Sequence, residues 1–490
     1  MKANQTYCLR KGVRLQNSGT HCFLVSRFPL QATRLDAAWK PLFHQMDDGH
    51  PRAIHQLNRR PSGVGDAALE RFLNGLARKG FLTSVQAPSG DAPAAVSVII
   101  PVRNRPRDLK RCLDSLEELD YPREKLEIIV VDDASADRTP QVAAQYPVHL
   151  IRNTLNRGAS YSRNRGARHA SGDILCFLDS DCHVPVQWLR ELTTIFNDPR
   201  VAAGGGMVTS AMDRRPLDRY EKVKSSLHMG HRGRDSHGGG AFFYLPSCNL
   251  AVRRTVFTRM GGFNEEMVVG EDVDLCWRLV DSGGVIVYRP TALVFHRHRN
   301  RLWSFCRRRY DYGTSEPLLQ SRHRRRRKKF PLWPQPTLFW LLMAAAALLH
   351  PVLAPLALVL LLTDSVQSRR RAAQMGLQLS YPTVLQARCR QYASVLYHMA
   401  AFGSRYYLLV AFMLSVFGGG WIGTLILVGH VIVGLVQFII KRPNLDPLSF
   451  FFFFSLEQIS YQTGVWTGCM VHRLFSPVAP RPCLRRKAVI

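Results

Sequence analysis

Short apolar runs alternate with amphipathic stretches between residues 95 and 300 of this chain. The runs are rich in Val, Ile and Leu, and most of them end in polar residues, as buried parallel strands do. Helix-like stretches separate them, for example at Leu109–Leu119 and Asp272–Val280. We therefore predict an α/β domain with a mostly parallel sheet, its strands at Val96–Pro101, Glu127–Val131, Val148–Arg152, Ile174–Leu178 and Val285–Tyr288.

The pattern differs before residue 95. Residues 1–86 contain short strand-like and helix-like runs of their own, and residues 87–94 are rich in Ala, Pro, Gly, Ser and Asp, as linkers are. We expect a small N-terminal domain, a linker, and then the α/β domain over residues 95–320. The elements expected in the small domain are strands at Val13–Leu15 and Cys22–Val25 and helices at Ala32–Met46 and Asp66–Lys79.

The last third of the chain, residues 321–490, is basic at first and then strongly apolar. Pro331–Thr363 and Tyr406–Ile440 contain no Asp, Glu, Lys or Arg, and each is long enough for one tilted transmembrane helix. Pro351 and Pro355 would kink the first, and Gly418–Gly420 would break the second. An interfacial hairpin and a buried helical domain are the alternatives. Phe450–Phe454 is too short to span a bilayer and is expected at its interface or in a core.

The charge balance points to an anionic partner. Lys and Arg number 66 against 36 Asp and Glu, a net charge of +30. The run Arg322–Lys329 lies directly before an apolar region, which favours anionic membrane lipid over nucleic acid. The 11 cysteines form no CxxC pair, and Met1–Arg10 has no apolar signal region. We therefore expect no nucleic-acid partner and a location on the cytoplasmic face of the inner cell membrane.

Polar residues follow the first two strands of the α/β domain. Pro101 and Asn104 end the first strand, and Asp132 and Asp133 end the second. The carboxyl edge of an open α/β sheet is where ligands bind, and carboxylates there can accept hydrogen bonds from a nucleoside. Arg163, in a helix-like segment that follows, offers a planar fork of donors to a diphosphate.

Two acidic pairs supply the candidate chemistry. Asp179 and Asp181 follow a buried strand at a spacing that suits a hard divalent cation, Mg²⁺ or Mn²⁺. Glu271 and Asp272 open a helix, where a carboxylate is stabilised in its charged form and can act as a general base. Gly204–Gly206 are expected to make a sharp bend beside a ligand.

In order along the chain, the segments SVIIPVRN, IIVVDDAS, NRGASYSRN, FLDSD, PSCNLAVRR and GEDVDLCWRL resemble the family 2 glycosyltransferases of GT-A fold. The resemblance implies an inverting hexosyltransferase that uses a nucleotide-diphospho-sugar. Its implied donor-binding residues are Pro101, Asn104, Asp132, Asp133, Arg163 and Asp179. Its implied metal ligands are Asp179, Asp181 and His296, its base is Asp272, and Asn249, Glu271 and Trp277 lie near the acceptor.

A narrower resemblance connects other parts of the chain. The segments YDYGTSE (Tyr310–Glu316), NLDPL and SYQTGVWTGC (Ser460–Cys469) look like the glycosyltransferases of the mycofactocin system. The N-terminal unit looks like a PqqD-type winged-helix domain, which captures a peptide as an added strand. This resemblance implies UDP-glucose as donor and a small peptide-derived acceptor.

The chain departs from processive polysaccharide synthases, because no Gln-x-x-Arg-Trp motif follows Asp272 and Phe305–Tyr310 stands in that region. This favours the addition of one or a few sugars. Two alternatives stay open. One is a glycosyltransferase acting on lipid or cell-envelope glycan, and the other is a non-catalytic binding protein that retains the fold.

Overall fold

The computed structural model describes residues 5–18, 21–27, 30–86, 93–231, 233–236, 243–298, 301–417 and 421–484. The chain divides into two compact units. One contains Met1–Ser89, Lys329–Phe402 and Arg481–Ile490, and the other contains Gly90–Lys328 and Gly403–Pro480. Most of the expected linker, residues 87–94, lies outside the described residues, as do Gly418–Gly420.

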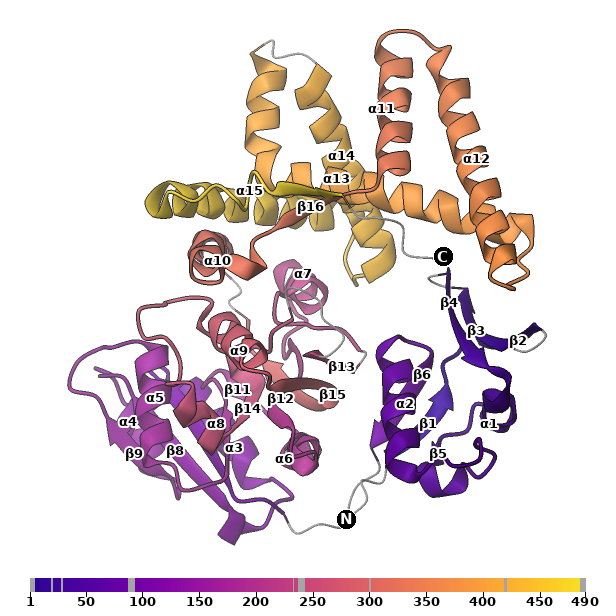
Figure 1. Ribbon diagram of the computed structural model, residues 1–490. Coiled ribbons are helices and arrows are strands. Elements are labelled where there is room, and N and C mark those ends of the chain that lie inside the picture. The colour runs from indigo at the N-terminus through magenta and orange to yellow at the C-terminus, as the bar shows by residue number, and fades with distance from the viewer. Residues whose placement is uncertain are drawn as a thin grey trace. The chain divides into compact units, whose positions relative to one another are not determined.

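The larger unit is built on a nine-stranded mixed sheet in the order β11-β15-β12-β14-β10-β7-β8-β9, with β13 paired to β15 (Figure 1). Strands β10, β7, β8 and β9 run parallel, whereas β14 is antiparallel to both of its neighbours. The α/β class expected from the sequence is confirmed. The strands are β7 (Val96–Val102), β8 (Leu126–Asp132), β9 (His149–Arg152), β10 (Ile174–Phe177), β11 (Cys182–His183), β12 (Val201–Ser210), β13 (Arg234–Asp235), β14 (Leu250–Arg253) and β15 (Val285–His296).

Helices pack on both faces of this sheet. Alternate residues of β7 face opposite cores: Val98 packs with α3 and α6, and Ile99 packs with α8 and α9. Because both faces are covered, the strand is apolar throughout rather than alternating. The helices of this part are α3 (Pro106–Glu117), α4 (Thr139–Ala143), α5 (Ala159–His169), α6 (Trp188–Thr193), α7 (Pro216–Lys224), α8 (Arg254–Arg259) and α9 (Glu271–Asp281).

The expected bend at Gly204–Gly206 is wrong, because these glycines lie inside strand β12. A Cβ on Gly205 or Gly206 would collide with the backbone of Asn249 or Ala292. The glycines therefore serve the close approach of neighbouring backbone within the sheet and do not make a turn. Strands β11, β12 and β14 were not expected from the sequence.

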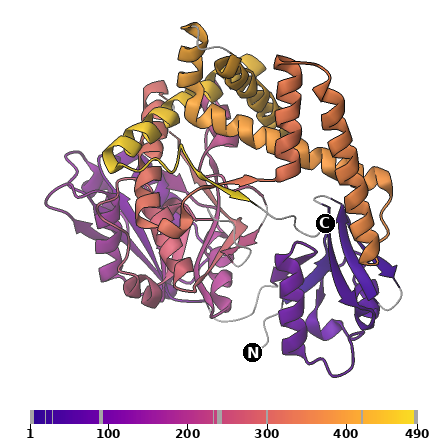
Figure 2. The ribbon, with the colours of Figure 1, turned by 45° about the horizontal axis from the view of Figure 1, so that its top comes forward.

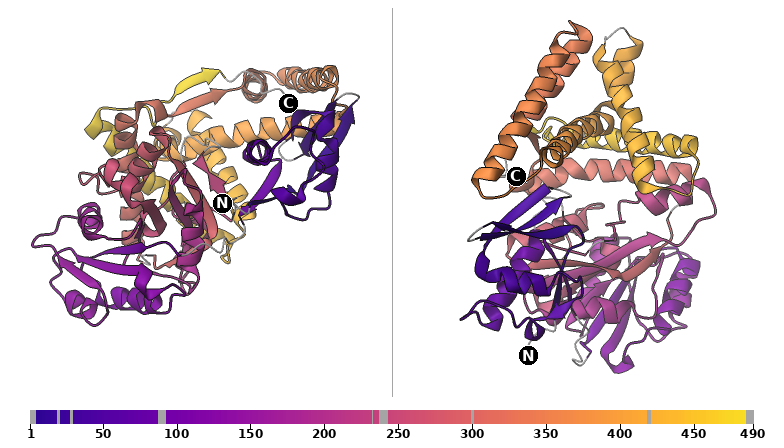
Figure 3. Two further views of the ribbon diagram at one scale, coloured as in Figure 1. Left: turned by 60° about the horizontal axis from the view of Figure 1, so that its bottom comes forward. Right: turned by 90° about the vertical axis from the view of Figure 1, so that its right-hand side faces the viewer.

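The smaller unit contains the N-terminal domain (indigo in Figures 2 and 3). One sheet has the order β5-β1-β6, and a second is the antiparallel meander β2-β3-β4. The helix expected at Ala32–Met46 is wrong in its first half, because Leu30–Asp36 pairs with β3 throughout. Only the second half is helical, as a 3₁₀ turn at Ala37–Trp39 followed by α1. The elements are β1 (Gln5–Leu9), β2 (Val13–Ser18), β3 (His21–Arg27), β4 (Leu30–Asp36), α1 (Lys40–Gln45), β5 (Arg52–Ala53), α2 (Asp66–Arg78) and β6 (Leu82–Gln86).

The same unit contains a helical hairpin, α11 (Pro334–Leu348) and α12 (Leu353–Gln374) (Figures 1 and 2). The single kinked helix expected over Pro331–Thr363 is therefore two helices. Phe23 and Val25 of β3 pack against Ala372 of α12 and against Leu377, which follows α12. Strand β16 (Lys329–Leu332) pairs in parallel with β17 (Arg481–Leu484) in this unit.

Two helices, α13 (Tyr381–Val416) and α14 (Trp421–Lys441), are long and apolar enough to cross a membrane. Helix α13 begins in the smaller unit and ends in the larger one. In the larger unit, α10 (Leu302–Arg322) crosses α15 (Pro447–His472) at very short range. A Cβ on Gly464 of α15 would strike the Tyr310 carbonyl of α10. Phe450 and Phe454 of α15 are buried.

Candidate functional site

A buried arginine joins the two acidic pairs. Arg163, on α5, donates from Nη2 to Asp179 at 2.6 Å and from Nη1 to Glu271 at 3.0 Å. Burial opposes its charge, but the carboxylates of Asp179 and Glu271 raise the pKa of Arg163 above its usual range. Its Nε is buried and meets no acceptor among the described residues. Residues 108 positions apart in sequence thus form one cluster.

Asp272 is the second acid of the helix α9 pair. Its carboxylate accepts hydrogen bonds from the Val273 and Ser247 amides at 2.8 and 3.2 Å. Gly270, at φ +84°, supplies the left-handed residue from which the helix starts. Burial, and then the negative charge of Glu271, raise the pKa of Asp272 to about 7. A carboxyl group with this pKa can accept a proton near neutral pH and later release it.

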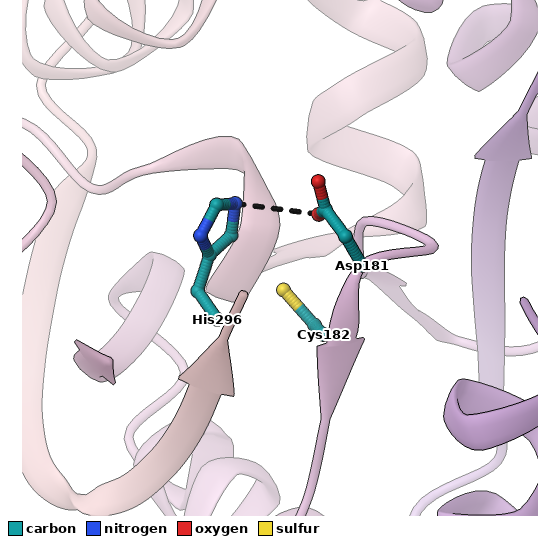
Figure 4. Close-up of side chains that lie close together, drawn as sticks. All are labelled: Asp181, Cys182 and His296. Atoms are coloured by element: carbon teal, nitrogen blue, oxygen red, sulfur yellow. Dashed lines mark ion pairs between the residues drawn. The ribbon is translucent and has the colours of Figure 1, made fainter. Parts of the chain in front are cut away.

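Asp181, the second acid of the pair that begins with Asp179, lies beside the end of β15. It accepts from Arg105 and lies 3.3 Å from Nε2 of His296, and Figure 4 shows these two side chains pointing toward one another. The Cys182 sulfur lies beside them, and one ligand atom from each of the three residues falls within 4.8 Å of the others. Burial opposes the charge on His296, but Asp181 raises the pKa of His296 to about 9.

Asp132 and Asp133, at the carboxyl end of β8, accept hydrogen bonds from backbone and side-chain donors. Asp133 accepts from the amides of Arg157 and Gly158 at 2.9 and 2.8 Å and from Asn153 at 2.8 Å. Asp132 is fully buried and accepts from Arg152 at 3.3 Å. Both acids thus lie at the carboxyl edge, as the sequence predicted, and Asp133 fixes the loop that leads into α5.

Pro101 and Asn104 lie at the same edge. Pro101 is buried near the end of β7, paired with Val131 of β8. Asn104 is exposed, at φ +51°, and its side-chain oxygen accepts from the Ala136 amide at 2.9 Å. A non-glycine residue tolerates this backbone conformation where the surrounding structure fixes it. Here the hydrogen bond between Ala136 and Asn104 ties the loop after β8 to the loop after β7.

Asn249 and Trp277 are not brought into this cluster. Asn249 is fully buried, accepts from Trp188 Nε1 at 3.0 Å and donates to the Ala292 carbonyl at 2.8 Å. Trp277, on α9, is buried against Met267 and Leu319. Asn249 thus links α6 to β15, and Trp277 packs α9 against α10.

Sequence reasoning missed two arginines of the site. Arg105 pairs with Asp181, and it follows the first strand in the very segment that suggested a ligand loop. Arg308, on α10, lies with its guanidinium 5.3 Å from the Tyr312 ring. Tyr312 raises the pKa of Arg308, whereas burial lowers it. The negative charges of Asp179 and Glu271 raise it further, so the net shift is upward. The arginine run at 307–309 was the signal for it, but nothing local distinguishes Arg308 from its neighbours.

Arginines and carboxylates therefore alternate across one edge of the sheet. Such an arrangement can bind an anionic group or a divalent cation on one side and hold a base on the other. Residues 97–261 match the family described as Glycosyl transferase family 2.

Curated relatives extend the match. A "Pre-mycofactocin glycosyltransferase" of Mycobacterium tuberculosis is 30% identical over 405 residues, 80% of this chain and 83% of that protein. "Glycosyltransferase AglE" of Haloferax volcanii is 30% identical over 42% of this chain and 67% of its own length. Among solved structures, the mannosyltransferase PcManGT of Pyrobaculum calidifontis, in complex with GDP-Man and Mn²⁺, is 23% identical with a TM-score of 0.39, over 63% of this chain and 89% of that one.

Proposed function

The chain belongs to glycosyl transferase family 2, and on this premise we propose that it is an inverting hexosyltransferase of GT-A fold. It transfers glucose from UDP-glucose to a hydroxyl group of a small peptide-derived acceptor. The observation that carries the proposal is the cluster around Arg163, which holds an acid of the donor pair, Asp179, and an acid of the α9 pair, Glu271, on one guanidinium.

In this proposal Asp272 is the general base. The acceptor hydroxyl gives its proton to the Asp272 carboxylate while its oxygen bonds to the anomeric carbon of the sugar. The bond from that carbon to the diphosphate oxygen breaks, and the nucleoside diphosphate leaves from the opposite face, which inverts the configuration. The two backbone donors on Asp272 hold the carboxylate in place for this step.

A divalent cation, Mg²⁺ or Mn²⁺, fits the acids on the donor side. Asp179, Asp181 and His296 would hold it, since carboxylate oxygens suit both ions. Of the two ions, Mn²⁺ is the transition metal and accepts an imidazole ligand more readily than Mg²⁺ does. The cation would neutralise charge on the leaving diphosphate. Cys182 adds a sulfur that neither ion prefers. In the structure Arg105 and Arg163 balance the charges of these acids.

The donor nucleoside would bind at the carboxyl ends of β7 and β8 and along the loops that follow them, where Pro101, Asn104, Asp132 and Asp133 lie. Arg163, with Nη groups already engaged, positions Asp179 and keeps a buried positive charge beside the diphosphate. Asn249 and Trp277 would act through the elements that they pack.

The similarity to a protein named for pre-mycofactocin supports a peptide-derived acceptor in mycofactocin biosynthesis. The N-terminal domain would recognise the peptide in the manner of a PqqD-like winged helix, by pairing with a strand edge. Helices α13 and α14 support membrane association, with lipid as a partner. The face that we propose is the cytoplasmic one. The two helices also favour the second candidate, transfer to a lipid or cell-envelope glycan.

The test is mass spectrometry of products after incubation with UDP-glucose and each acceptor class. A hexose added to the peptide-derived acceptor supports the proposal, and a hexose added only to lipid supports the second candidate. Donor hydrolysis without any acceptor transfer would contradict both. Binding of UDP-glucose with neither transfer to an acceptor nor hydrolysis of the donor would indicate the non-catalytic alternative.

A further inference from the structure

The α11–α12 hairpin of the smaller unit presents an apolar tip to solvent. No Asp, Glu, Lys or Arg occurs from Pro331 to Thr363. The large side chains that it exposes include Leu341, Leu349, Val352, Leu356 and Val359, and Leu349 at the turn is 80% exposed. Several large apolar side chains exposed on one hairpin, with no charged residue among them, mark a contact with lipid or protein.

The turn at the tip satisfies its own backbone donors. The Leu349 and His350 amides donate to the Ala345 carbonyl at 2.8 and 3.3 Å, and Pro351 has no amide hydrogen. The Val352 amide donates to Nδ1 of His350 at 3.3 Å. The next two amides, of residues 353 and 354, donate to the carbonyls of His350 and Pro351. Pairing of these donors within the chain lowers the cost of moving the turn out of water, because unsatisfied backbone groups are costly in hydrocarbon.

The base of the hairpin is polar, anchored and basic. Asp364 is buried and accepts from the Tyr392 hydroxyl at 3.1 Å, and Trp340 Nε1 donates to the Tyr392 carbonyl at 2.8 Å. These bonds fix both arms to α13. Beyond them, Arg369–Arg371 are exposed at the far end of α12. An apolar tip with a basic base matches the profile of an anionic lipid surface.

The length of the arms limits how deep the tip reaches. Helix α11 has 15 residues, which at 1.5 Å per residue is about 22 Å. Helix α12 is longer, but its uncharged part, Leu353–Thr363, is only about 16 Å long. The hydrocarbon core of a bilayer is about 30 Å thick, so the hairpin is too short to cross it. We propose that the α11–α12 hairpin inserts its tip into one leaflet of an anionic membrane. This lipid contact is separate from α13 and α14 and does not depend on the proposed transferase activity.

Photo-crosslinking in the full-length protein tests the proposal. Leu349→p-benzoylphenylalanine is irradiated with vesicles of phosphatidylcholine and phosphatidylglycerol, and lipid adducts are measured by mass spectrometry. The matched control is Leu155→p-benzoylphenylalanine, at a site that is 68% exposed on the catalytic part. We expect adducts on acyl chains several-fold more abundant at 349 than at 155. Equal yields, or adducts at 349 to a second copy of the chain, would overturn the proposal.

A charge variant tests the anionic part. Arg369→Gln, Arg370→Gln and Arg371→Gln are combined in the Leu349-labelled protein, with thermal unfolding as the check on folding. We expect several-fold fewer lipid adducts in vesicles that contain phosphatidylglycerol, and no change in pure phosphatidylcholine. An unchanged yield in both kinds of vesicle would refute the role of the three arginines.

Discussion

At the scale of single residues, the account rests on two carboxyl groups whose surroundings differ. Asp179 is held by a buried guanidinium, and Asp272 by two backbone amides. The guanidinium gives Asp179 a fixed cationic partner, whereas burial and the charge of Glu271 raise the pKa of Asp272 to about 7. The same residue type therefore suits donor binding in one place and proton transfer in the other.

Asp272→Asn removes the base and keeps the shape of the side chain. We expect kcat to fall by roughly 10²- to 10⁴-fold, the usual contribution of a general base, while UDP-glucose still binds. Turnover assays and calorimetric titration of the donor measure the two effects. Asp281→Asn, on the same helix α9 and half-exposed, is the matched control and should retain activity. Loss of donor binding in step with turnover would count against the base role.

The pH profile follows from the raised pKa of Asp272. The base acts only when deprotonated, so kcat/KM should fall as the pH drops below about 7. Glu271→Gln removes the neighbouring negative charge that helps to raise this pKa, so the acid limb should move to lower pH. Rate measurements from pH 5 to 9 in both proteins check this. An acid limb that stays in place in the variant would exclude the coupling.

At the scale of elements, the two segments YDYGTSE and SYQTGVWTGC lie against each other. Gly313 of α10 meets the backbone of Tyr461 and Gly464 of α15. Glu316 accepts from the Tyr461 hydroxyl and from Lys328, both at 2.6 Å. Close backbone contact allows the two helices to share a buried polar network, and α10 is also the helix that carries Arg308.

Gly464→Ala tests this crossing. A methyl group there meets the Tyr310 carbonyl, so we expect a loss of stability of roughly 1–3 kcal/mol, measured by denaturant unfolding. Gly403→Ala on α13 is the control, because its Cβ would lie 3.4 Å from Ile426, an ordinary contact. If both variants unfold at the same denaturant concentration as the parent protein, the helices are not held at this distance.

The elements also show how far the sequence could be read. Strands β7 and β8 were predicted to within a residue or two because a strand covered on both faces is a continuous apolar run. Strand β12 was missed because its glycines are needed for the close approach of Ala292 and Asn249, which are far away in sequence. The link from Arg163 to Glu271 was missed for the same reason, although each residue was singled out alone. Local patterns report burial, whereas these contacts depend on tertiary approach.

At the scale of the whole molecule, the proposal joins a metal-assisted donor site, a base and a membrane location. The metal can be tested without mutation. EDTA should reduce turnover to background, and Mn²⁺ or Mg²⁺ should restore it. Asp181→Asn should weaken the apparent affinity for Mn²⁺ at least tenfold, because even the loss of a group that only orients a ligand costs about that much. Full activity in EDTA would remove the cation from the account.

The most direct measurement of the central claim is identification of the transferred group. Purified protein is incubated with UDP-glucose, Mn²⁺ and the peptide-derived acceptor, and the products are analysed by mass spectrometry and NMR. We expect one or a few hexoses on the acceptor, an inverted anomeric configuration and equimolar release of UDP, all lost in Asp272→Asn. A product with retained configuration, or transfer that persists in Asp272→Asn, would contradict it.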